Sequence, residues 1–231
     1  MKNFLDVVSG PLEPHAVRIT TRKHQKLLLT AQPDEVLYFI RKGLFLARAS
    51  LPHLRNRVLG IHYPGDLVRT LAMPPLVGAE ITAASEKGDV WRLRWPVVKG
   101  ILDENPDLAR EVSDRLADQA ARSALHNVIL AELNGDERVA ALMIELALRM
   151  GTETAAGRVF EMPLSRMDIA EHLALNADTV SRIVSRMRAK GLLAAAGRRH
   201  LVCPRFKDLA CACPLAPVIA RMHKAEHLLS A

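Results

Sequence analysis

No proline or glycine interrupts the sequence from Asp107 to Leu133, and this stretch constrains the fold more than any other feature. As one helix it would be about 40 Å long, which is more than a small domain buries. Two rows of residues recur every seven positions. The first row is Ala109, Leu116, Ser123 and Leu130, and the second is Val112, Gln119, His126 and Leu133. Such a seam predicts a two-chain coiled coil with a polar middle.

Short strands are predicted across residues 17–95, ahead of this helix. Val36–Arg41 and Leu44–Ser50 form an expected hairpin that turns at Lys42–Gly43. Other predicted strands are Arg57–His62, closed by Tyr63-Pro64-Gly65-Asp66, then Ile81–Ser85 and Val90–Arg94, which flank a turn at Glu86–Asp89. Strands at this spacing favour an antiparallel roll or sandwich over a βαβ sheet.

Asn134 and Gly135 are expected to end the long helix, because both tolerate the left-handed conformation that is common at helix C-termini. Asp136 is expected to cap the next helix, which continues to about Met150. We therefore place a domain boundary at residues 134 and 135.

Two closely spaced helices follow. Ser165 is predicted to begin the first, with Asp168 three residues later in a capping-box position. Ala174–Leu175 forms a tight turn, and Asn176 caps a basic second helix over Ala177–Lys190. A short helix, a turn of three or four residues and a basic helix are typical of a helix-turn-helix.

Positive charge is concentrated around this second helix. Residues 178–207 contain eight lysines and arginines but one acid, an excess that equals the net charge of +7 of the whole chain. A basic block inside a folded domain indicates a polyanion partner, here double-stranded DNA.

The polar face of the second helix offers side chains suited to reading bases. Arg182 can donate two hydrogen bonds to guanine, Asp178 can accept one from cytosine, and Ser181 can do either. Leu192–Leu193 and Leu201–Val202 are predicted to pair as a hairpin, or wing. The residues expected to contact the DNA backbone are Ser165, Arg166, Thr179, Arg186, Arg188, Lys190, and Arg198 and Arg199 at the wing tip.

The segment 162–193 resembles the C-terminal domain of the CRP/FNR family of bacterial transcription regulators. The specific motifs are Leu-Ser-Arg-x-Asp-Ile-Ala at 164–170 and Thr-Val-Ser-Arg at 179–182, and Glu137–Leu142 and Tyr63–Leu67 also match. The resemblance implies an α+β fold with three parts. These are an antiparallel β-roll sensor domain of the cyclic-nucleotide-binding kind (1–105), a dimerisation helix (106–134), and a winged helix-turn-helix DNA-binding domain with a C-terminal tail (135–231).

The resemblance also implies a homodimeric, sequence-specific transcription regulator that binds a palindromic TTGA-like operator. In the FNR and FixK branch a Glu, a Ser and an Arg contact the half-site, and Ser181 and Arg182 match that pattern. Asp178 replaces the Glu and is one methylene shorter. RNA polymerase is a further expected partner if the protein activates transcription.

The effector is not named by the sequence. Gly78–Ser85 lacks the arginine that binds a cyclic nucleotide, and residues 1–202 lack the cysteines of an iron–sulfur cluster. Haem stays open as a cofactor through the available histidines, as does control without any effector. Those histidines are His15, His24, His53, His62 and His126. For a small organic ligand, the polar part of the seam is the expected pocket: Gln119, Ser123, His126 and Asn127.

A thiol- or metal-responsive regulator is the alternative, acting through Cys203, Cys211 and Cys213 with His223 or His227. Free thiols in a cytosolic protein are the simpler interpretation, and we predict no dedicated metal site. The sequence contains no Gly-rich phosphate loop and no nucleophile–base set, so an enzyme is not expected. It has no apolar stretch of membrane-spanning length and no secretory signal, which favours the cytoplasm.

Overall fold

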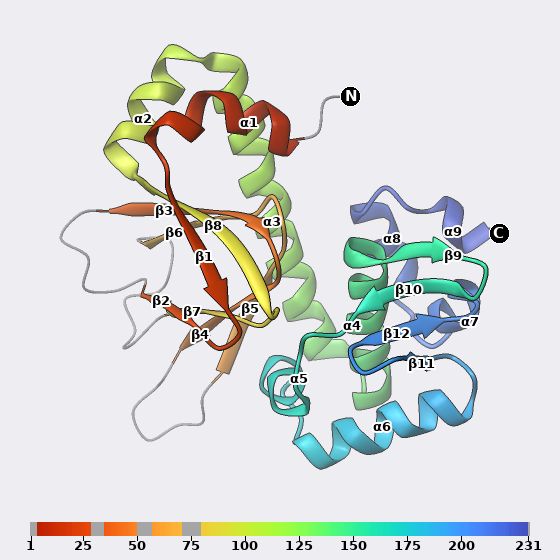
Figure 1. Cartoon of the computed structure of the whole chain (residues 1–231). Coiled ribbons are helices and arrows are strands. Elements are labelled where there is room, and N and C mark those ends of the chain that lie inside the picture. The colour runs from red at the N-terminus through yellow and green to blue at the C-terminus, as the bar shows by residue number, and fades with distance from the viewer. Residues whose placement is uncertain (1–3, 29–34, 50–56, 71–79, 231) are drawn as a thin grey trace. The chain divides into compact units, whose positions relative to one another are not determined.

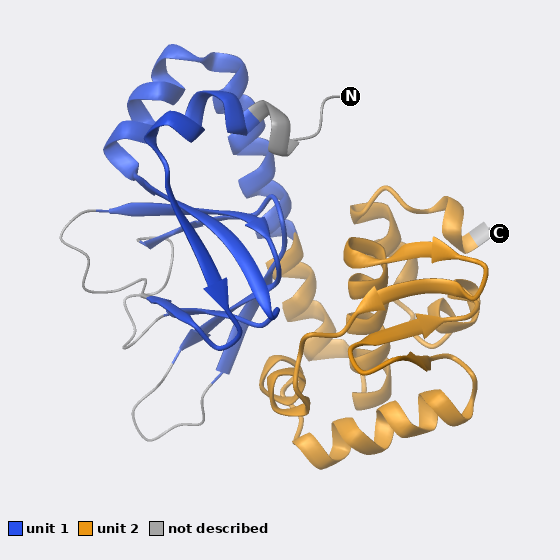
Figure 2. Ribbon diagram, viewed as in Figure 1, with its two compact units in different colours: residues 1–121 blue, residues 122–231 orange. Residues whose placement is uncertain are grey.

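The computed structural model describes residues 4–28, 35–49, 57–70 and 80–230. The chain divides into two compact units, residues 1–121 and 122–231 (Figure 2). The division falls inside helix α3 (Pro106–Glu132), so this helix contributes its first half to unit 1 and its second half to unit 2. Within the described ranges, no helix is both long and apolar enough to cross a membrane.

Unit 1 contains two four-stranded antiparallel sheets (Figure 1). The first has the order β1 (Val17–Arg22), β8 (Lys87–Arg94), β3 (Val36–Lys42), β6 (Leu67–Arg69). The second has the order β2 (Lys26–Leu28), β7 (Glu80–Ala83), β4 (Phe45–Ala49), β5 (Arg57–His62). Side chains from both sheets, among them Ile40 of β3 and Phe45 of β4, form one buried cluster. The predicted antiparallel roll is confirmed.

A second buried cluster covers the other face of the β3 sheet. Phe39 and Trp91 lie at its centre, with ring centroids 5.8 Å apart. The helices α1 (Phe4–Leu12), α2 (Trp95–Glu104) and the start of α3 pack against it, and a short 3-10 turn, η1 (Glu13–His15), links α1 to β1. Strand β3 is therefore apolar on both faces, because each face meets a different core.

The predicted hairpin between Val36 and Ser50 is wrong in its pairing. Strand β3 pairs with β8 and β6, whereas β4 pairs with β5 and β7, so consecutive strands lie in different sheets. Gly43, at φ +88°, carries the chain from one sheet to the other. An apolar run that is buried on both faces has no alternation, so the sequence could not show which neighbour it pairs with. Ser50 lies outside the described residues.

Unit 2 is a winged helix-turn-helix, as predicted. Helix α4 (Gly135–Met150) packs against α5 (Arg166–Leu173) and α6 (Ala177–Ala189). A four-stranded sheet has the order β11 (Ala194–Ala196), β12 (His200–Cys203), β10 (Gly157–Glu161), β9 (Thr152–Thr154). The tail forms α7 (Phe206–Ala210), α8 (Ala216–Met222) and α9 (His227–Ser230), and α7 and α8 contact α4.

The predicted roles of Asn134 and Asp136 are both wrong. Asn134 has an extended conformation (φ −74°, ψ 173°) and is itself the N-cap of α4, in a reciprocal capping box with Glu137. Arg138 satisfies the end of α3 instead, donating to the carbonyls of Leu130 (2.7 Å) and Leu133 (2.8 Å). Asparagine suits both a helix start and a left-handed end, so Glu137 three residues later was the deciding signal.

Residues in the second row of the predicted coiled-coil seam make contacts within their own chain. Val112 is buried in the core of unit 1 and Leu133 is buried in unit 2. Gln119 exchanges two hydrogen bonds of 2.9 Å with the backbone of Leu67. The seam prediction is therefore wrong for this row, because a helix that also covers its own domains uses one apolar row for them.

Candidate nucleic-acid interface

Side-chain caps fix both helices of the helix-turn-helix. Ser165 Oγ accepts from the Asp168 amide (3.1 Å), and the Asp168 carboxylate accepts from the Ser165 amide (2.7 Å). Ala174 adopts the left-handed conformation (φ 54°) and ends α5. Asn176 Oδ1 accepts from the Thr179 amide at 2.7 Å and begins α6. The predicted caps and turn are confirmed, and they set the direction in which α6 leaves the turn.

The apolar face of α6 determines which residues point outward. Val180, Ile183, Val184 and Met187 are buried against the rest of unit 2. The opposite face is exposed and polar: Asp178, Arg182, Ser185, Arg186, Arg188 and Lys190. A narrow apolar stripe on a basic helix leaves most of its circumference available to a polyanion.

Asp178 and Arg182 lie one turn apart on the exposed face, as the spacing predicts. Ser181 is half-buried beside them, and its hydroxyl donates to the Ala177 carbonyl at 2.9 Å. To contact a base, this hydroxyl must rotate away from the helix backbone. The three side chains expected to read bases thus share one end of α6, its N-terminal end, which is the part that such helices insert into the major groove.

Arg166 of α5 and Arg188 of α6 are within electrostatic range of each other. Burial lowers the pKa of Arg166, and the positive charge of Arg188 lowers it further. Arginine nevertheless stays protonated at neutral pH. Two like charges held together repel each other, and a phosphate placed between them would relieve that repulsion.

The other residues expected at the DNA backbone have different surroundings. Arg186 Nη2 contacts both carboxylate oxygens of Asp136, at 2.7 and 2.8 Å, which ties α6 to the start of α4. Both side chains are more than half exposed, so the pair contributes at most about 1 kcal/mol and can be exchanged for a phosphate. Ser165 is exposed at the start of α5, and Thr179 is half-buried in the first turn of α6.

The wing is the β11–β12 hairpin, and its tip holds the two predicted arginines. Gly197 turns the chain at φ +77°, and Arg198 and Arg199 are exposed beside it. The Arg199 carbonyl accepts from the Met162 amide at 2.7 Å, which anchors the tip to the strand before α5. The first wing strand begins at Ala194 rather than Leu192, because the Leu192 amide still donates to the Met187 carbonyl of α6 at 3.0 Å.

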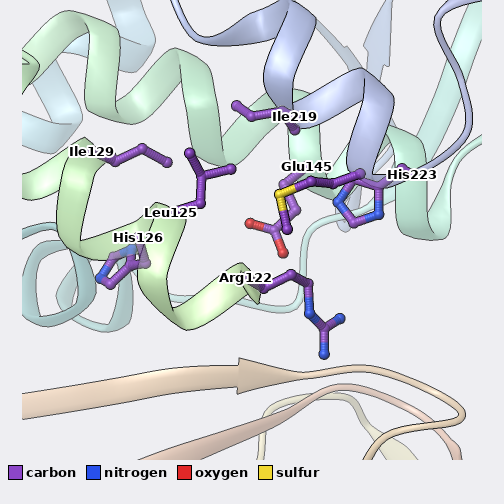
Figure 3. A pocket seen from close by; sticks show the side chains of 8 residues that line it. Arg122, Leu125, His126, Ile129, Glu145, Ile219 and His223 are labelled. Atoms are coloured by element: carbon purple, nitrogen blue, oxygen red, sulfur yellow. The ribbon is translucent and has the colours of Figure 1, made fainter. Parts of the chain in front are cut away.

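The four residues expected to line an effector pocket have separate environments. Gln119 bonds to Leu67 within unit 1, whereas Ser123 and Asn127 are exposed residues of unit 2. His126 stacks on His172 of α5, with ring centroids 4.0 Å apart. A cavity in unit 2 includes only His126 of the four (Figure 3). It is lined by Arg122, Leu125, His126, Ile129, Glu145, Ile219, Met222 and His223.

Two of the three cysteines are poorly placed for thiol chemistry. Cys203 and Cys213 are buried and Cys211 is exposed. Burial, with Asp208 and Glu153 adding to it, raises the pKa of Cys203 to about 11. Burial also raises the pKa of Cys213. Both thiols are therefore protonated at neutral pH and are weak nucleophiles.

The histidines considered for haem are scattered. His15 and His24 are exposed, and His62 lies 3.9 Å from the buried carboxylate of Asp66. His53 falls outside the described residues, as do Gly78 and Ala79 of the stretch compared with cyclic-nucleotide sites. Across the described part of the chain, no three His, Cys, Asp or Glu side chains are grouped as metal ligands.

These features define a class: a winged helix-turn-helix DNA-binding protein with an N-terminal β-roll. Residues 137–212 match the family model of the Crp-like helix-turn-helix domain. With the matches that follow, this supports the predicted similarity of the chain to the CRP/FNR family of transcription regulators.

Among curated proteins, a probable transcriptional activator of Rhizobium leguminosarum bv. viciae is 26% identical over 184 residues, covering 78% of this chain and 75% of the relative. The anaerobic regulatory protein of Pasteurella multocida (strain Pm70) is 24% identical, covering 77% of this chain and 65% of the relative.

Two solved structures share the fold. FixK2 from Bradyrhizobium japonicum has a TM-score of 0.73 at 24% identity, covering 86% of this chain and 97% of its own. A CooA mutant from Carboxydothermus hydrogenoformans has a TM-score of 0.72 at 18% identity, covering 90% and 94%.

Proposed function

We propose that this chain binds a palindromic TTGA-like operator as a homodimer and regulates transcription in response to a signal received by the β-roll and helix α3. The observation that carries the proposal is the exposed N-terminal end of α6, where Asp178, Ser181 and Arg182 stand together on a capped helix. Base-edge contacts of this kind supply specificity, while the surrounding arginines supply affinity. Such a regulator acts in the cytoplasm, and RNA polymerase is its partner if it activates.

Arg182 is the residue on which operator specificity rests most. Arg182→Ala removes a bidentate contact to guanine and should weaken operator binding by about 1–3 kcal/mol, relaxing preference at that base pair. A gel-shift titration with the TTGA palindrome and with variants at the guanine measures both effects. Arg221→Ala is the matched control, because Arg221 is an exposed arginine of α8 whose partner is Glu226.

If Arg182→Ala binds the palindrome as tightly as the parent, the assignment of α6 as the base-reading element fails. If both arginine variants weaken binding equally on every sequence, Arg182 contacts only phosphates. In either case the proposed half-site contact is overturned.

Homodimerisation is supported by a row of exposed small residues along α3. Successive spacings of four and three residues connect its members: Ser113, Ala117, Ala120, Ala124, Asn127 and Ala131. This is a heptad row distinct from the two predicted rows, and the residues beside it include the exposed apolar Val128. Alanine at these positions allows two helices to approach closely, and Asn127 would fix their register.

Transmission of a signal is supported by the contact of α3 with the turn before β6. Arg115 Nε donates to the Gly65 carbonyl at 2.8 Å and lies 3.7 Å from the fully buried carboxylate of Asp66. Gln119, one turn further along, holds Leu67. A movement of this turn would therefore displace α3. A ligand that binds more tightly to one position of the turn would shift the dimer towards the conformation that has the turn in that position.

A further inference from the structure

Two histidines join α3 to the first helix of the helix-turn-helix. The imidazoles of His126 (α3) and His172 (α5) stack at 4.0 Å with an interplanar angle of 11°. Arg138 of α4 reinforces the junction, because it donates to Leu130 of α3 at 2.7 Å and to Leu173 of α5 at 3.1 Å. Helix α5 leads through a three-residue turn into α6, so this histidine pair helps to hold the base-reading helix on α3.

The charged and titratable groups around the pair come from every neighbouring helix. Arg122 of α3, Glu145 of α4 and His223 of α8 line the cavity that His126 borders (Figure 3). His172 of α5 and Arg138 of α4 are further neighbours of His126. Among these groups, the positive charge of Arg138 favours a neutral imidazole at His126. Burial acts in the same direction, because His172 is only 7% exposed and His126 is half-buried.

We propose that the His126–His172 pair makes DNA binding sensitive to protons: acidification opens the contact between α3 and α5 and weakens operator binding. This inference rests on the proposed function, because its readout is operator affinity. Two imidazolium rings at this separation repel each other, and the positive charge of Arg138 disfavours a charged His126 further. Histidine is the side chain whose charge changes near neutral pH, so the change falls in a physiological range.

The direction of the pH effect follows from the titration of His126. Burial lowers the pKa of His126; a hydrogen bond to the His172 backbone raises it, and Arg138 lowers it again. The closed contact therefore binds fewer protons than an open one, in which an exposed histidine has a pKa of about 6.5. The closed contact is favoured above that pH and loses stability as the pH falls through and below it.

The test measures operator affinity of the full chain by fluorescence anisotropy between pH 8 and pH 5.5 at constant ionic strength. For the parent we expect a loss of about fivefold or more at the acid end, the low end of common allosteric couplings. His126→Phe keeps an aromatic ring but cannot titrate, so its affinity should vary much less. His227→Phe, at an exposed histidine of α9, is the matched control and should follow the parent.

Absence of operator binding at pH 8 would contradict the proposed function itself. Binding that is tight and equal at both ends of the pH range, or an equal loss in the parent and in His126→Phe, would overturn only the proton inference. Should His126→Phe fail to fold, NMR titration of the parent decides. His126 must titrate below about 6.5, and its protonation must accelerate amide exchange in α5. Titration at or above that value overturns the inference.

Discussion

Gly65 shows how one residue couples the β-roll to the long helix. It has φ +89°, and a Cβ at this position would collide with the Arg115 guanidinium. Gly65→Ala should therefore destabilise unit 1 by about 1–2 kcal/mol, the usual cost of a left-handed conformation for an L-residue. Thermal or urea unfolding of the full chain measures the change.

Gly100→Ala is the matched control for that prediction. Gly100 lies within helix α2, and nothing comes within 4 Å of a Cβ added there. Alanine is a better helix former than glycine by about 1 kcal/mol, so this variant should be stabilised. Equal effects of the two substitutions would show that the conformation of Gly65 is not constrained by its turn.

At this same scale, most local residue roles were predictable, Asn134 excepted, and distant ones were not. The caps at Ser165 and Asn176 depend on partners three residues away, so the sequence alone identified them. Arg186 pairs with Asp136, fifty positions earlier, and no local pattern indicates that contact. Arg138 and His172 were missed for the same reason, because their partners are brought near them only by packing of the helices.

At the scale of elements, substitutions at Asn134 distinguish the two roles that an asparagine can have between two helices. If Asn134 is the N-cap, Asn134→Ala should cost about 1 kcal/mol, and Asn134→Asp should retain most of the stability. If it were a left-handed helix end, Asn134→Gly would be the stabilising change and Asp would bring no benefit. Urea unfolding ranks the three variants by their free energy of unfolding. If Asn134→Gly is more stable than the parent, Asn134 is not the N-cap.

The existence of most elements was predictable, but their pairing was not. Strand β5 and helix α6 were expected within a residue of their observed bounds, because turn residues and caps mark where each begins and ends. The assignment of β3 and β4 to different sheets depends on which core covers each face. Both faces of β3 are apolar, so the sequence of the strand cannot predict the sheet to which it belongs.

At the scale of the whole molecule, different faces of α3 pack against different parts of the chain. Its first half presents Leu108 and Val112 to the core of unit 1, and its second half buries Ile129 and Leu133 in unit 2. Of these residues, Val112 and Leu133 belong to the second row that the sequence predicted as a dimer seam. The exposed row has alanine in place of large apolar side chains, which is why a search for leucine and valine at heptad spacing did not select it.

Two substitutions on neighbouring residues distinguish the two candidate seams. Ala124 is at the middle of the exposed alanine row, whereas Ser123 belongs to the first row predicted from the sequence. A glutamate at Ala124 would place like charges opposite each other where the helices of a dimer approach most closely, so Ala124→Glu should give monomers. Ser123→Glu would lie at the edge of that interface and should remain dimeric.

Light scattering after size-exclusion chromatography measures the molar mass directly, and operator binding provides a second readout. Because a palindrome is bound by two α6 helices, monomeric Ala124→Glu should lose operator affinity even though its DNA-contacting residues are intact. A dimeric Ala124→Glu together with a monomeric Ser123→Glu would restore the seam predicted from the sequence. In that case, the contacts of Val112, Gln119 and Leu133 within the chain would have to give way when the dimer forms.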